Sequence, residues 1–271
     1  MDFPLLTPGM TRDYLDKLGV RPRKSYGQNF LVDANLVRKS LEMAGVKAGE
    51  DIVEVGPGLG TLTRGLLNAG AKVWAVEFDK VMVCHLEEDL LSKAGGMLDI
   101  LEGDAVDFPR GNLLETKPFN IVANLPYAIT SNWLEGILAG GTLPGRMVLL
   151  VQKEAAQRLM ADIGTKSLGA ISLFLQSAYF QGGQYPVART CFYPAPDVDS
   201  VLLRLDLRED AFLFSKDQRA TIRQIFTMRR KQLGSVCRKM GLENWFGKVM
   251  DAGLPEGVRP EGVPLELWRQ L

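Results

Sequence analysis

The sequence is poor in the side chains that most often carry acid–base or metal chemistry. It contains one histidine, His85, and three cysteines, Cys84, Cys191 and Cys237, which lie far apart without Cys-x-x-Cys or Cys/His spacing. This pattern argues against a disulfide framework and against a zinc site, and it is typical of a reduced, cytosolic protein. We therefore expect no bound metal and a cytoplasmic location.

Long apolar runs and an excess of charge of one sign are also missing. No apolar run approaches the ~18 residues of a membrane-spanning helix, and the N-terminal stretch contains acids and a proline where a signal peptide needs an apolar core. The 32 basic and 32 acidic residues cancel, so the net charge identifies no partner. We expect no membrane association, and 271 residues suffice for one large α/β domain and a smaller one.

The most informative stretch is a glycine-rich turn. Within residues 51–55, positions 52, 53 and 55 are apolar and β-branched, which predicts a buried strand, and leucines at helical spacing follow Thr61. Gly56, Gly58 and Gly60 lie between the two elements. Glycines let a backbone approach a ligand, and a helix start offers free N–H groups. The spacing is not the Gly-x-Gly-x-x-Gly of dinucleotide-binding proteins, so we predict a nucleotide-type site without a pyrophosphate; an ordinary tight turn is the alternative.

Carboxylates follow two further predicted strands. Glu77 ends the run 72–76, where a second parallel strand should present a carboxylate to ribose hydroxyls. Asp104 follows the strand predicted over 97–101, and it can either accept from an exocyclic amine or cap its loop. Open α/β sheets bind ligands at the carboxyl ends of their strands, so both side chains are expected beside the glycine-rich turn. Asp79 is interpreted as the N-cap of the next helix.

The run 119–123 leads directly into Asn124-Leu125-Pro126-Tyr127. An amine conjugated to an aromatic base is a poor nucleophile because its lone pair is delocalised into the ring. The side-chain oxygen of Asn124 and a nearby backbone carbonyl can accept its two N–H bonds and so free the lone pair. Pro126 stiffens the backbone, and Tyr127 offers a ring on which a flipped-out base can stack. The tetrapeptide suits adenine; a turn with a core tyrosine is the alternative.

The single histidine does not complete a catalytic motif. His85 lies in a helix that is predicted to run from after Glu77 to about residue 93. No carboxylate, serine or cysteine is arranged around it in a known pattern, so the sequence favours a surface or packing role over a general base.

Basic residues cluster in two places. One is the segment 21–31, which predicts either a solvated arm or a strap that carries phosphate-seeking charges on one side and polar groups for the small ligand on the other. The other is a helix predicted over 218–233, in a second domain whose helical periodicity begins near residue 207. Rigid helices suit reading the shape of folded RNA. The residues available for phosphate contacts are Arg21, Arg23, Lys24, Arg223, Arg229, Arg230 and Lys231.

Together these motifs resemble the S-adenosylmethionine-dependent ribosomal RNA adenine dimethyltransferases, most closely the bacterial branch that acts on small-subunit (16S) rRNA. The combination is specific, although each motif alone is not. The matching residues are Gly27-Gln28-Asn29-Phe30-Leu31, Glu54-Val55-Gly56-Pro57-Gly58-Leu59-Gly60, Glu77, Gly103-Asp104, Asn124-Leu125-Pro126-Tyr127, Phe192-Tyr193-Pro194-Ala195-Pro196 with Val198-Asp199-Ser200, and Arg229-Arg230-Lys231 with Leu233.

The resemblance implies a Rossmann-like class I methyltransferase fold of the α/β class, with a mostly parallel sheet and an antiparallel edge. We expect this methyltransferase domain, with its N-terminal basic strap, over residues 1–206, and a small all-helical domain that binds rRNA over 207–271. S-adenosyl-L-methionine is the implied methyl donor. Its implied contacts are Gln28, Asn29, Leu31, Gly56, Gly58, Gly60, Glu77, Asp104 and Asn124.

The resemblance also implies the catalytic residues. Tyr127 and Phe192 sandwich the target adenine, while Asn124 and the Leu125 carbonyl, stiffened by Pro126, hold its N6. Methyl transfer then needs in-line alignment more than a base. The family dimethylates two adjacent adenosines in the hairpin near the 3′ end of 16S rRNA, so the implied partner is the partly assembled small (30S) ribosomal subunit, and we expect a monomer.

Three other functions remain open from the sequence. Relatives methylate large-subunit rRNA and confer antibiotic resistance, and a non-catalytic ribosome assembly factor can keep the same cofactor site. A DNA adenine methyltransferase would use a similar tetrapeptide but should carry a target-recognition insertion, and no long insertion is visible.

Overall fold

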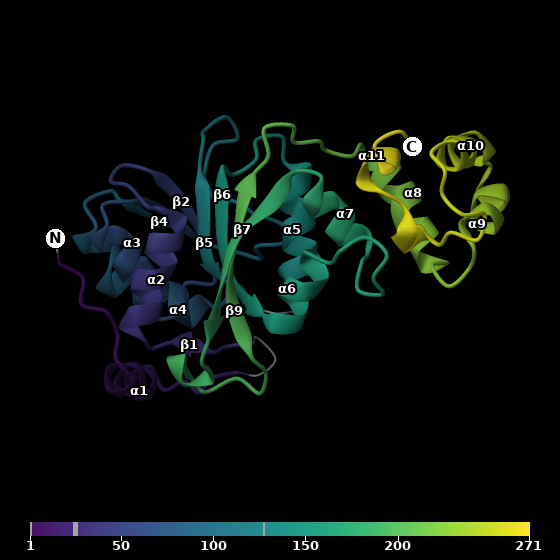
Figure 1. The fold of residues 1–271 in the computed structure, drawn as a ribbon. Coiled ribbons are helices and arrows are strands. Elements are labelled where there is room, and N and C mark those ends of the chain that lie inside the picture. The colour runs from purple at the N-terminus through teal and green to yellow at the C-terminus, as the bar shows by residue number, and fades with distance from the viewer. Residues whose placement is uncertain (1, 24–26, 127) are drawn as a thin grey trace. The chain divides into compact units, whose positions relative to one another are not determined.

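The computed structural model describes residues 2–23, 27–126 and 128–271, and the chain forms two compact units (Figure 1). The first unit comprises Met1–Lys153 and Phe180–Leu207, and the second comprises Glu154–Tyr179 and Arg208–Leu271. Lys24 and Tyr127, two of the predicted site residues, lie outside the described residues.

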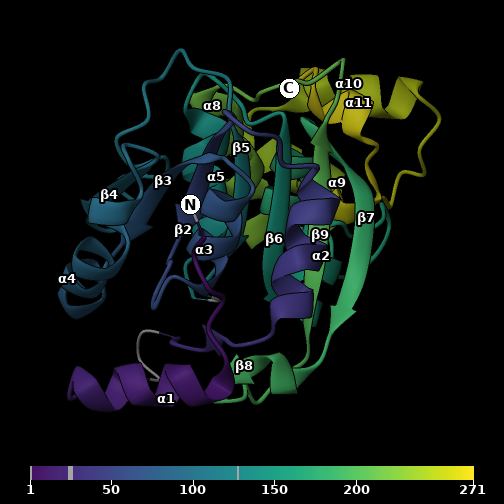
Figure 2. The ribbon, with the colours of Figure 1, turned by 90° about the vertical axis from the view of Figure 1, so that its left-hand side faces the viewer.

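The first unit is built on a seven-stranded sheet in the order β4-β3-β2-β5-β6-β9-β7 (Figure 2). Its strands are β2 (Asp51–Val55), β3 (Lys72–Glu77), β4 (Leu98–Glu102), β5 (Asn120–Asn124), β6 (Arg146–Gln152), β7 (Tyr179–Val187) and β9 (Ser200–Leu207). The pairs of the first five strands are parallel, and β9 pairs antiparallel with β6. The predicted fold class, a mostly parallel sheet with an antiparallel edge, is confirmed.

Helices flank this sheet because their apolar faces are buried against it. They are α2 (Ala34–Ala44), α3 (Thr61–Asn68), α4 (Lys80–Asp89) and α5 (Thr130–Ala139). Helix α4 is shorter than predicted, since residues 91–93 continue as a separate 3-10 turn, η2 (Leu91–Lys93). Asp79 caps α4 as expected, because its side chain accepts from the Val81 N–H at 3.0 Å.

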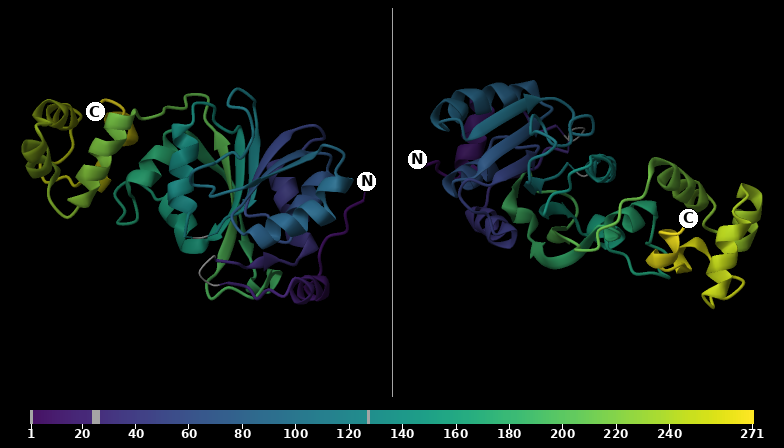
Figure 3. Two further views of the ribbon diagram at one scale, coloured as in Figure 1. Left: turned by 180° about the vertical axis from the view of Figure 1, so that it is seen from behind. Right: turned by 90° about the horizontal axis from the view of Figure 1, so that it is seen from above.

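A second, two-stranded sheet lies apart from the main one. It pairs β1 (Phe30–Leu31) with β8 (Phe192–Tyr193), which follows the 3-10 turn η3 (Arg189–Cys191). The strands are antiparallel, with Phe30 opposite Tyr193 and Leu31 opposite Phe192. Helix α1 (Pro8–Lys17) lies beside this pair (Figures 2 and 3), and the Arg12 guanidinium lies 5.9 Å from the centre of the Tyr193 ring.

The second unit is helical. It contains α6 (Lys153–Leu159), α7 (Ala170–Gln176), α8 (Lys216–Thr227), α9 (Leu233–Met240), α10 (Glu243–Asp251), the 3-10 turn η4 (Pro260–Gly262) and α11 (Leu265–Trp268). Its core includes Trp245 and Trp268, whose rings lie 4.9 Å apart, and the buried faces of α8 and α9. None of the helices in the described parts of the chain is long and apolar enough to cross a membrane.

The division of the chain differs from the predicted boundary in one segment. The predicted break near residue 207 coincides with the break between the units, but residues 154–179 group with the C-terminal helices instead of the sheet. The reason is side-chain packing within the second unit. The ring centres of Phe174 and Phe214 lie 5.6 Å apart, and the Ser177 hydroxyl donates to the Phe212 carbonyl at 2.7 Å.

The helix predicted over 218–233 is wrong in its second half. Helix α8 ends at Thr227, and α9 begins only at Leu233. The Thr227 hydroxyl donates to the Gln224 carbonyl at 2.7 Å, and the Met228 N–H closes a tighter turn on Ile225. Residues 229–231 therefore lie in a turn between the two helices.

Candidate functional site

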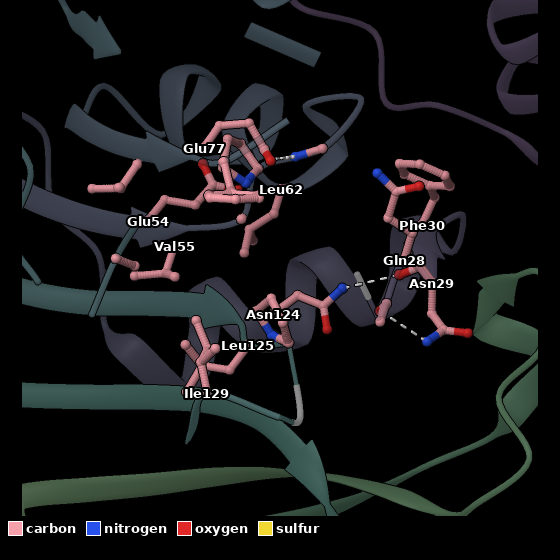
Figure 4. Close-up of a pocket in the computed structure, with 18 of the residues that line it drawn as sticks. Gln28, Asn29, Phe30, Glu54, Val55, Leu62, Glu77, Asn124, Leu125 and Ile129 are labelled. Atoms are coloured by element: carbon pink, nitrogen blue, oxygen red, sulfur yellow. Dashed lines mark hydrogen bonds between the residues drawn. The ribbon is translucent and has the colours of Figure 1, made fainter. Parts of the chain in front are cut away.

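A cavity of about 350 Å³ lies at the carboxyl ends of β2, β3, β4 and β5 (Figure 4). Its volume is in the range of small-molecule sites. The structure brings together most of the residues that the sequence predicts for cofactor binding and for chemistry. The predicted site residues that line the cavity are Gln28, Asn29, Leu31, Gly56, Gly58, Glu77, Asp104, Asn124, Leu125 and Pro126.

The glycine-rich turn forms the floor of this cavity. Gly56 and Gly58 have φ values of 66° and 58°, in the left-handed region that favours glycine. A Cβ at Gly58 would lie 3.1 Å from the Phe30 ring, so the backbone passes close beneath that side chain. The turn is thus both conformationally restricted to glycine and tightly packed.

Gly60 is not among the residues that line the cavity, and its predicted contact with the cofactor stays a prediction. It caps α3 with a φ of 81°, and a Cβ there would lie 2.7 Å from Leu86 and 2.9 Å from Leu90. The α-carbon of Gly60 therefore faces α4, and glycine is needed at this position for packing.

The Glu77 carboxylate is held at the cavity wall by two backbone donors. Gly58 N–H donates to Oε2 at 3.0 Å (Figure 4), and Asp79 N–H donates to Oε1 at 2.9 Å. Burial raises the pKa of Glu77, and these hydrogen bonds partly oppose that shift. Each oxygen keeps a further lone pair, so the group can still accept from ribose hydroxyls.

A second buried carboxyl group, Glu54, lines the same cavity. Glu54 belongs to the glycine-rich motif, and an acid in the middle of a buried strand is itself an unusual signal of function. The Thr63 hydroxyl donates to Glu54 Oε2 at 2.7 Å. Burial, helped by the nearby Glu77, raises the pKa of Glu54 to about 8. A cationic ligand in the cavity would favour the ionised form.

Asp104 caps its loop, which is one of the two roles that the sequence allowed, and its contact with an exocyclic amine stays a prediction. Its Oδ1 accepts from the Val106 N–H at 2.8 Å, which is a loop cap, and the residue also lines the cavity. The cavity is therefore rich in acceptors, with Glu54, Glu77 and Asp104 on neighbouring strands. This composition complements a ligand that carries positive charge and hydrogen-bond donors.

Asn124 is oriented by the strap that covers the cavity. Its Nδ2 donates to the Asn29 carbonyl at 3.2 Å (Figure 4). A carbonyl can only accept, so the amide nitrogen must face it, and Oδ1 is left as an acceptor. The sequence predicted the acceptor but not the residue that fixes its direction.

Side-chain amides hold the strap in place. Gln28 Nε2 donates to Asp79 Oδ2 at 2.9 Å, and Gln28 Oε1 accepts from the Arg23 N–H at 2.9 Å. Asn29 Nδ2 donates to the Gly27 carbonyl at 3.1 Å. Gln28 therefore anchors the strap to the start of α4 as well as lining the cavity.

Phe192 lies behind the strap. It is 4% exposed, belongs to the same apolar cluster as Leu31, and is not among the residues that line the cavity. Its stacking role, like that of Tyr127, stays a prediction.

The predicted RNA-binding residues fall into different environments. Arg21, Arg23, Arg223, Arg230 and Lys231 are exposed. Arg229 is half-buried within the second unit: its Nη2 donates to the Lys166 carbonyl at 2.6 Å and lies 3.9 Å from the Glu261 carboxylate. These contacts indicate a structural role for Arg229, and its predicted phosphate contact stays a prediction.

Known proteins are similar to this chain in sequence and in fold. A model of the ribosomal RNA adenine dimethylase family matches residues 19–263. The chain belongs to this family. Within it, the chain is 50% identical over 271 residues to ribosomal RNA small subunit methyltransferase A of Opitutus terrae, and the alignment covers 98% of both proteins.

Solved structures of dimethylase-like enzymes have the same fold. A dimethyladenosine transferase from Plasmodium falciparum matches with a TM-score of 0.70 and 23% identity, over 88% of this chain and 94% of that one. The 23S rRNA methyltransferase ErmE matches with a TM-score of 0.65 and 25% identity, over 89% and 96%. The second protein is named for 23S rRNA, so the fold alone does not identify which rRNA is the target.

Proposed function

We propose that this dimethylase-family protein transfers methyl groups from S-adenosyl-L-methionine to N6 of two adjacent adenosines in the 3′-terminal hairpin of 16S rRNA. The observation that carries the proposal is the orientation of Asn124 Oδ1 at an acidic cavity, fixed by the Asn29 carbonyl. The full-length relative in Opitutus terrae supports the small subunit as substrate. The enzyme class follows from family membership.

The residues that line the cavity fit S-adenosylmethionine. When bound, this group supplies an electrophilic methyl on a positively charged sulfur. Glu77 can accept from the ribose hydroxyls, Asp104 from the adenine amine, and the ionised form of Glu54 can balance positive charge. Gly56 and Gly58 leave room for close approach of the ligand to the backbone.

The chain's own groups then prepare the target nitrogen. Asn124 Oδ1 and the Leu125 carbonyl accept the two N6 hydrogens of adenine, which draws the nitrogen toward a tetrahedral geometry and frees its lone pair. Positioning supplies most of the rate enhancement, so a general base is not needed for nucleophilic attack. Each cycle replaces one N6 hydrogen with a methyl group, releases that hydrogen as a proton and leaves the demethylated donor as the second product, so a second cycle on the remaining N–H gives N6,N6-dimethyladenine.

Recognition of the substrate is assigned to aromatic and basic side chains. Tyr127 and Phe192 stack on the flipped-out adenine, and the exposed cations contact phosphates of the small (30S) ribosomal subunit. These cations are Arg21, Arg23, Lys24, Arg223, Arg230 and Lys231. The protein acts as a monomer in the cytoplasm and links methylation to subunit assembly.

Transfer of labelled methyl from S-adenosylmethionine to unmethylated small subunits tests this proposal, with large subunits, naked rRNA and duplex DNA in parallel. Dimethyladenosine from small subunits alone is the expected result of nucleoside analysis. Label on large subunits would move the protein to the branch that methylates 23S rRNA. Tight subunit binding without label on any substrate would identify a non-catalytic assembly factor.

A further inference from the structure

The loop between α6 and α7 is an exposed segment that does not line the cavity. Every residue from Asp162 to Ser167 is exposed, whereas Ala161 and Leu168 on either side are buried. The loop nevertheless has a defined backbone, because the Thr165 hydroxyl and N–H both donate to the Asp162 carbonyl, at 2.7 and 3.2 Å. These two hydrogen bonds fix a turn within the loop.

Two contacts from the C-terminal part of the second unit hold this loop. The Gly164 N–H donates to the Glu261 carbonyl of η4 at 2.7 Å, and Arg229 Nη2 donates to the Lys166 carbonyl at 2.6 Å. The Arg229 guanidinium also lies 3.9 Å from the Glu261 carboxylate. Arg229 thus connects the loop to η4, and it does so from the turn between α8 and α9. All three segments belong to the second unit.

Arginine suits this position because of the shape of its guanidinium group. The group presents five N–H donors in a planar fork, so it can donate to a carbonyl while it lies beside a carboxylate. The Arg229 side chain is 32% exposed and the Glu261 side chain is 12% exposed, so the pair is partly shielded from water. Salt therefore weakens this link less than it weakens a fully exposed ion pair.

The loop brings a further cation to the turn between α8 and α9. Arg230 and Lys231 follow Arg229 directly and are exposed, and Lys166 is exposed as well. None of these three exposed side chains forms an ion pair within the parts of the chain that the structure describes. Although 63 positions separate Lys166 from Arg229, the hydrogen bond places the loop within the reach of one arginine side chain from the turn. Asp162 is the only acid of the loop.

We propose that the α6–α7 loop is part of the RNA-binding surface: Lys166 contacts phosphate beside Arg230 and Lys231, and Arg229 is the positioning residue that holds the loop there. The inference rests on the proposed function, because the phosphates are those of the small-subunit rRNA. It adds a contact from a segment outside the motifs that identify the family. Each phosphate that a cation neutralises raises both the affinity for RNA and the salt dependence of that affinity.

Removal of the Lys166 charge tests the contact without disturbing the fold, because the side chain is exposed. We expect Lys166→Ala to weaken binding to small subunits about fivefold and to flatten the slope of log K against log salt by roughly one unit. Affinity for S-adenosylmethionine should not change. Lys248→Ala, at an exposed lysine of α10 in the same unit, is the matched control and should leave binding unchanged. Equal affinities of these two variants for small subunits would overturn the inference.

A double-mutant cycle tests the positioning role of Arg229. The loop loses its anchor in Arg229→Ala, so in that background Lys166→Ala should change the affinity for small subunits by less than about twofold. Binding is measured at a temperature at which thermal unfolding shows every variant to be folded. Additive losses of affinity from the two substitutions would show that Arg229 does not position Lys166.

Chemical acetylation of lysines gives an independent test on the wild-type chain, which also serves if Arg229→Ala fails to fold. Small subunits should protect Lys166 and Lys231 from the reagent and leave Lys248 reactive, and mass spectrometry measures each site. An unprotected Lys166 beside a protected Lys231 would overturn the inference and leave the proposed function intact. Failure of the wild-type protein to bind or methylate small subunits would instead refute the proposed function.

Discussion

Asn124 Nδ2 donates a hydrogen bond to the Asn29 carbonyl across 95 residues of sequence. This contact links the strap that covers the cavity to the side chain proposed to hold the target nitrogen. It determines which end of the amide is available, because the amide nitrogen is engaged and the oxygen is left as the acceptor. The strap is thus part of the arrangement for chemistry as well as a cover.

Replacement of Asn124 by alanine should abolish methyl transfer while subunit binding stays nearly intact. The variant loses the acceptor for N6, and loss of one such polar contact costs at least about a hundredfold in rate. Methyl transfer and subunit binding are measured on the same preparation. Asn112→Ala, at an exposed amide outside the cavity, is the control and should retain both. Loss of subunit binding in Asn124→Ala would contradict a role in chemistry.

The exposed turn between α8 and α9 should contribute to RNA affinity through Arg230 and Lys231. Charge reversal of both residues should weaken binding to small subunits and flatten the dependence of log K on log salt by roughly one unit per lost phosphate contact. Binding titrations at several salt concentrations measure the slope. Affinity for S-adenosylmethionine should not change. An unchanged salt slope would mean that these cations face solvent in the complex.

Arg229, next to this pair, should behave differently. Its guanidinium is bonded to the Lys166 carbonyl, so Arg229→Ala should lower the melting temperature of the protein more than Arg230→Ala does. Loss of one hydrogen bond to a charged group costs about 1.5 to 3 kcal/mol. Thermal unfolding of the two single variants makes the comparison, and equal melting temperatures would contradict a structural role for Arg229.

The buried carboxyl of Glu54 should make the stability of the free protein depend on pH. Its pKa is raised from 4.5 to about 8, so the folded state holds the proton more tightly than the unfolded chain does. The stabilisation is fully present below pH 4.5 and is lost as the pH rises through about 8. As the pH rises from about 5 to about 8, the melting temperature of the wild-type protein should therefore fall relative to that of Glu54→Gln, because the folded state progressively loses the advantage of its tightly held proton. A difference in melting temperature between the wild-type protein and Glu54→Gln that does not vary with pH would exclude the raised pKa of Glu54.

The packing role of Gly60 predicts a large effect on stability. Gly60→Ala combines an unfavourable φ with a collision against Leu86, whereas Gly96 has a similar φ, 82°, and open space around it. Gly60→Ala should thus destabilise the fold by about 1 to 3 kcal/mol more than Gly96→Ala, which is the usual effect of overpacking. Chemical denaturation measures both. Equal losses of unfolding free energy in the two variants would show that backbone strain alone matters and that the side chains of α4 move to make room for the added methyl group.

The strand ends could be predicted from the sequence because their signals are local. An apolar run followed by a polar residue gives a parallel strand and its carboxyl end, which is why Glu77, Asp104 and Asn124 were expected at one edge and lie there. Fold class and family motifs follow from the same short-range patterns.

Features that depend on distant neighbours were not predictable in this way. Gly60 faces α4 because Leu86 and Leu90 pack against it, and no local pattern shows which side of a turn faces a ligand. The hydrogen bond from Arg229 to the Lys166 carbonyl could not be predicted because the two residues lie 63 positions apart in the sequence. Residues 154–179 have ordinary helical periodicity, which does not reveal the unit that they join.

The pairing of β1 with β8 limits how the family can diversify. Leu31, which lines the cavity, is the register partner of Phe192, the ring assigned to the target base. Any substitution that alters the strap changes the neighbour of that aromatic side chain. Chimaeras between relatives with different RNA targets should therefore exchange the two segments together, because a hybrid with only one of them would inherit a mismatched pair of strands.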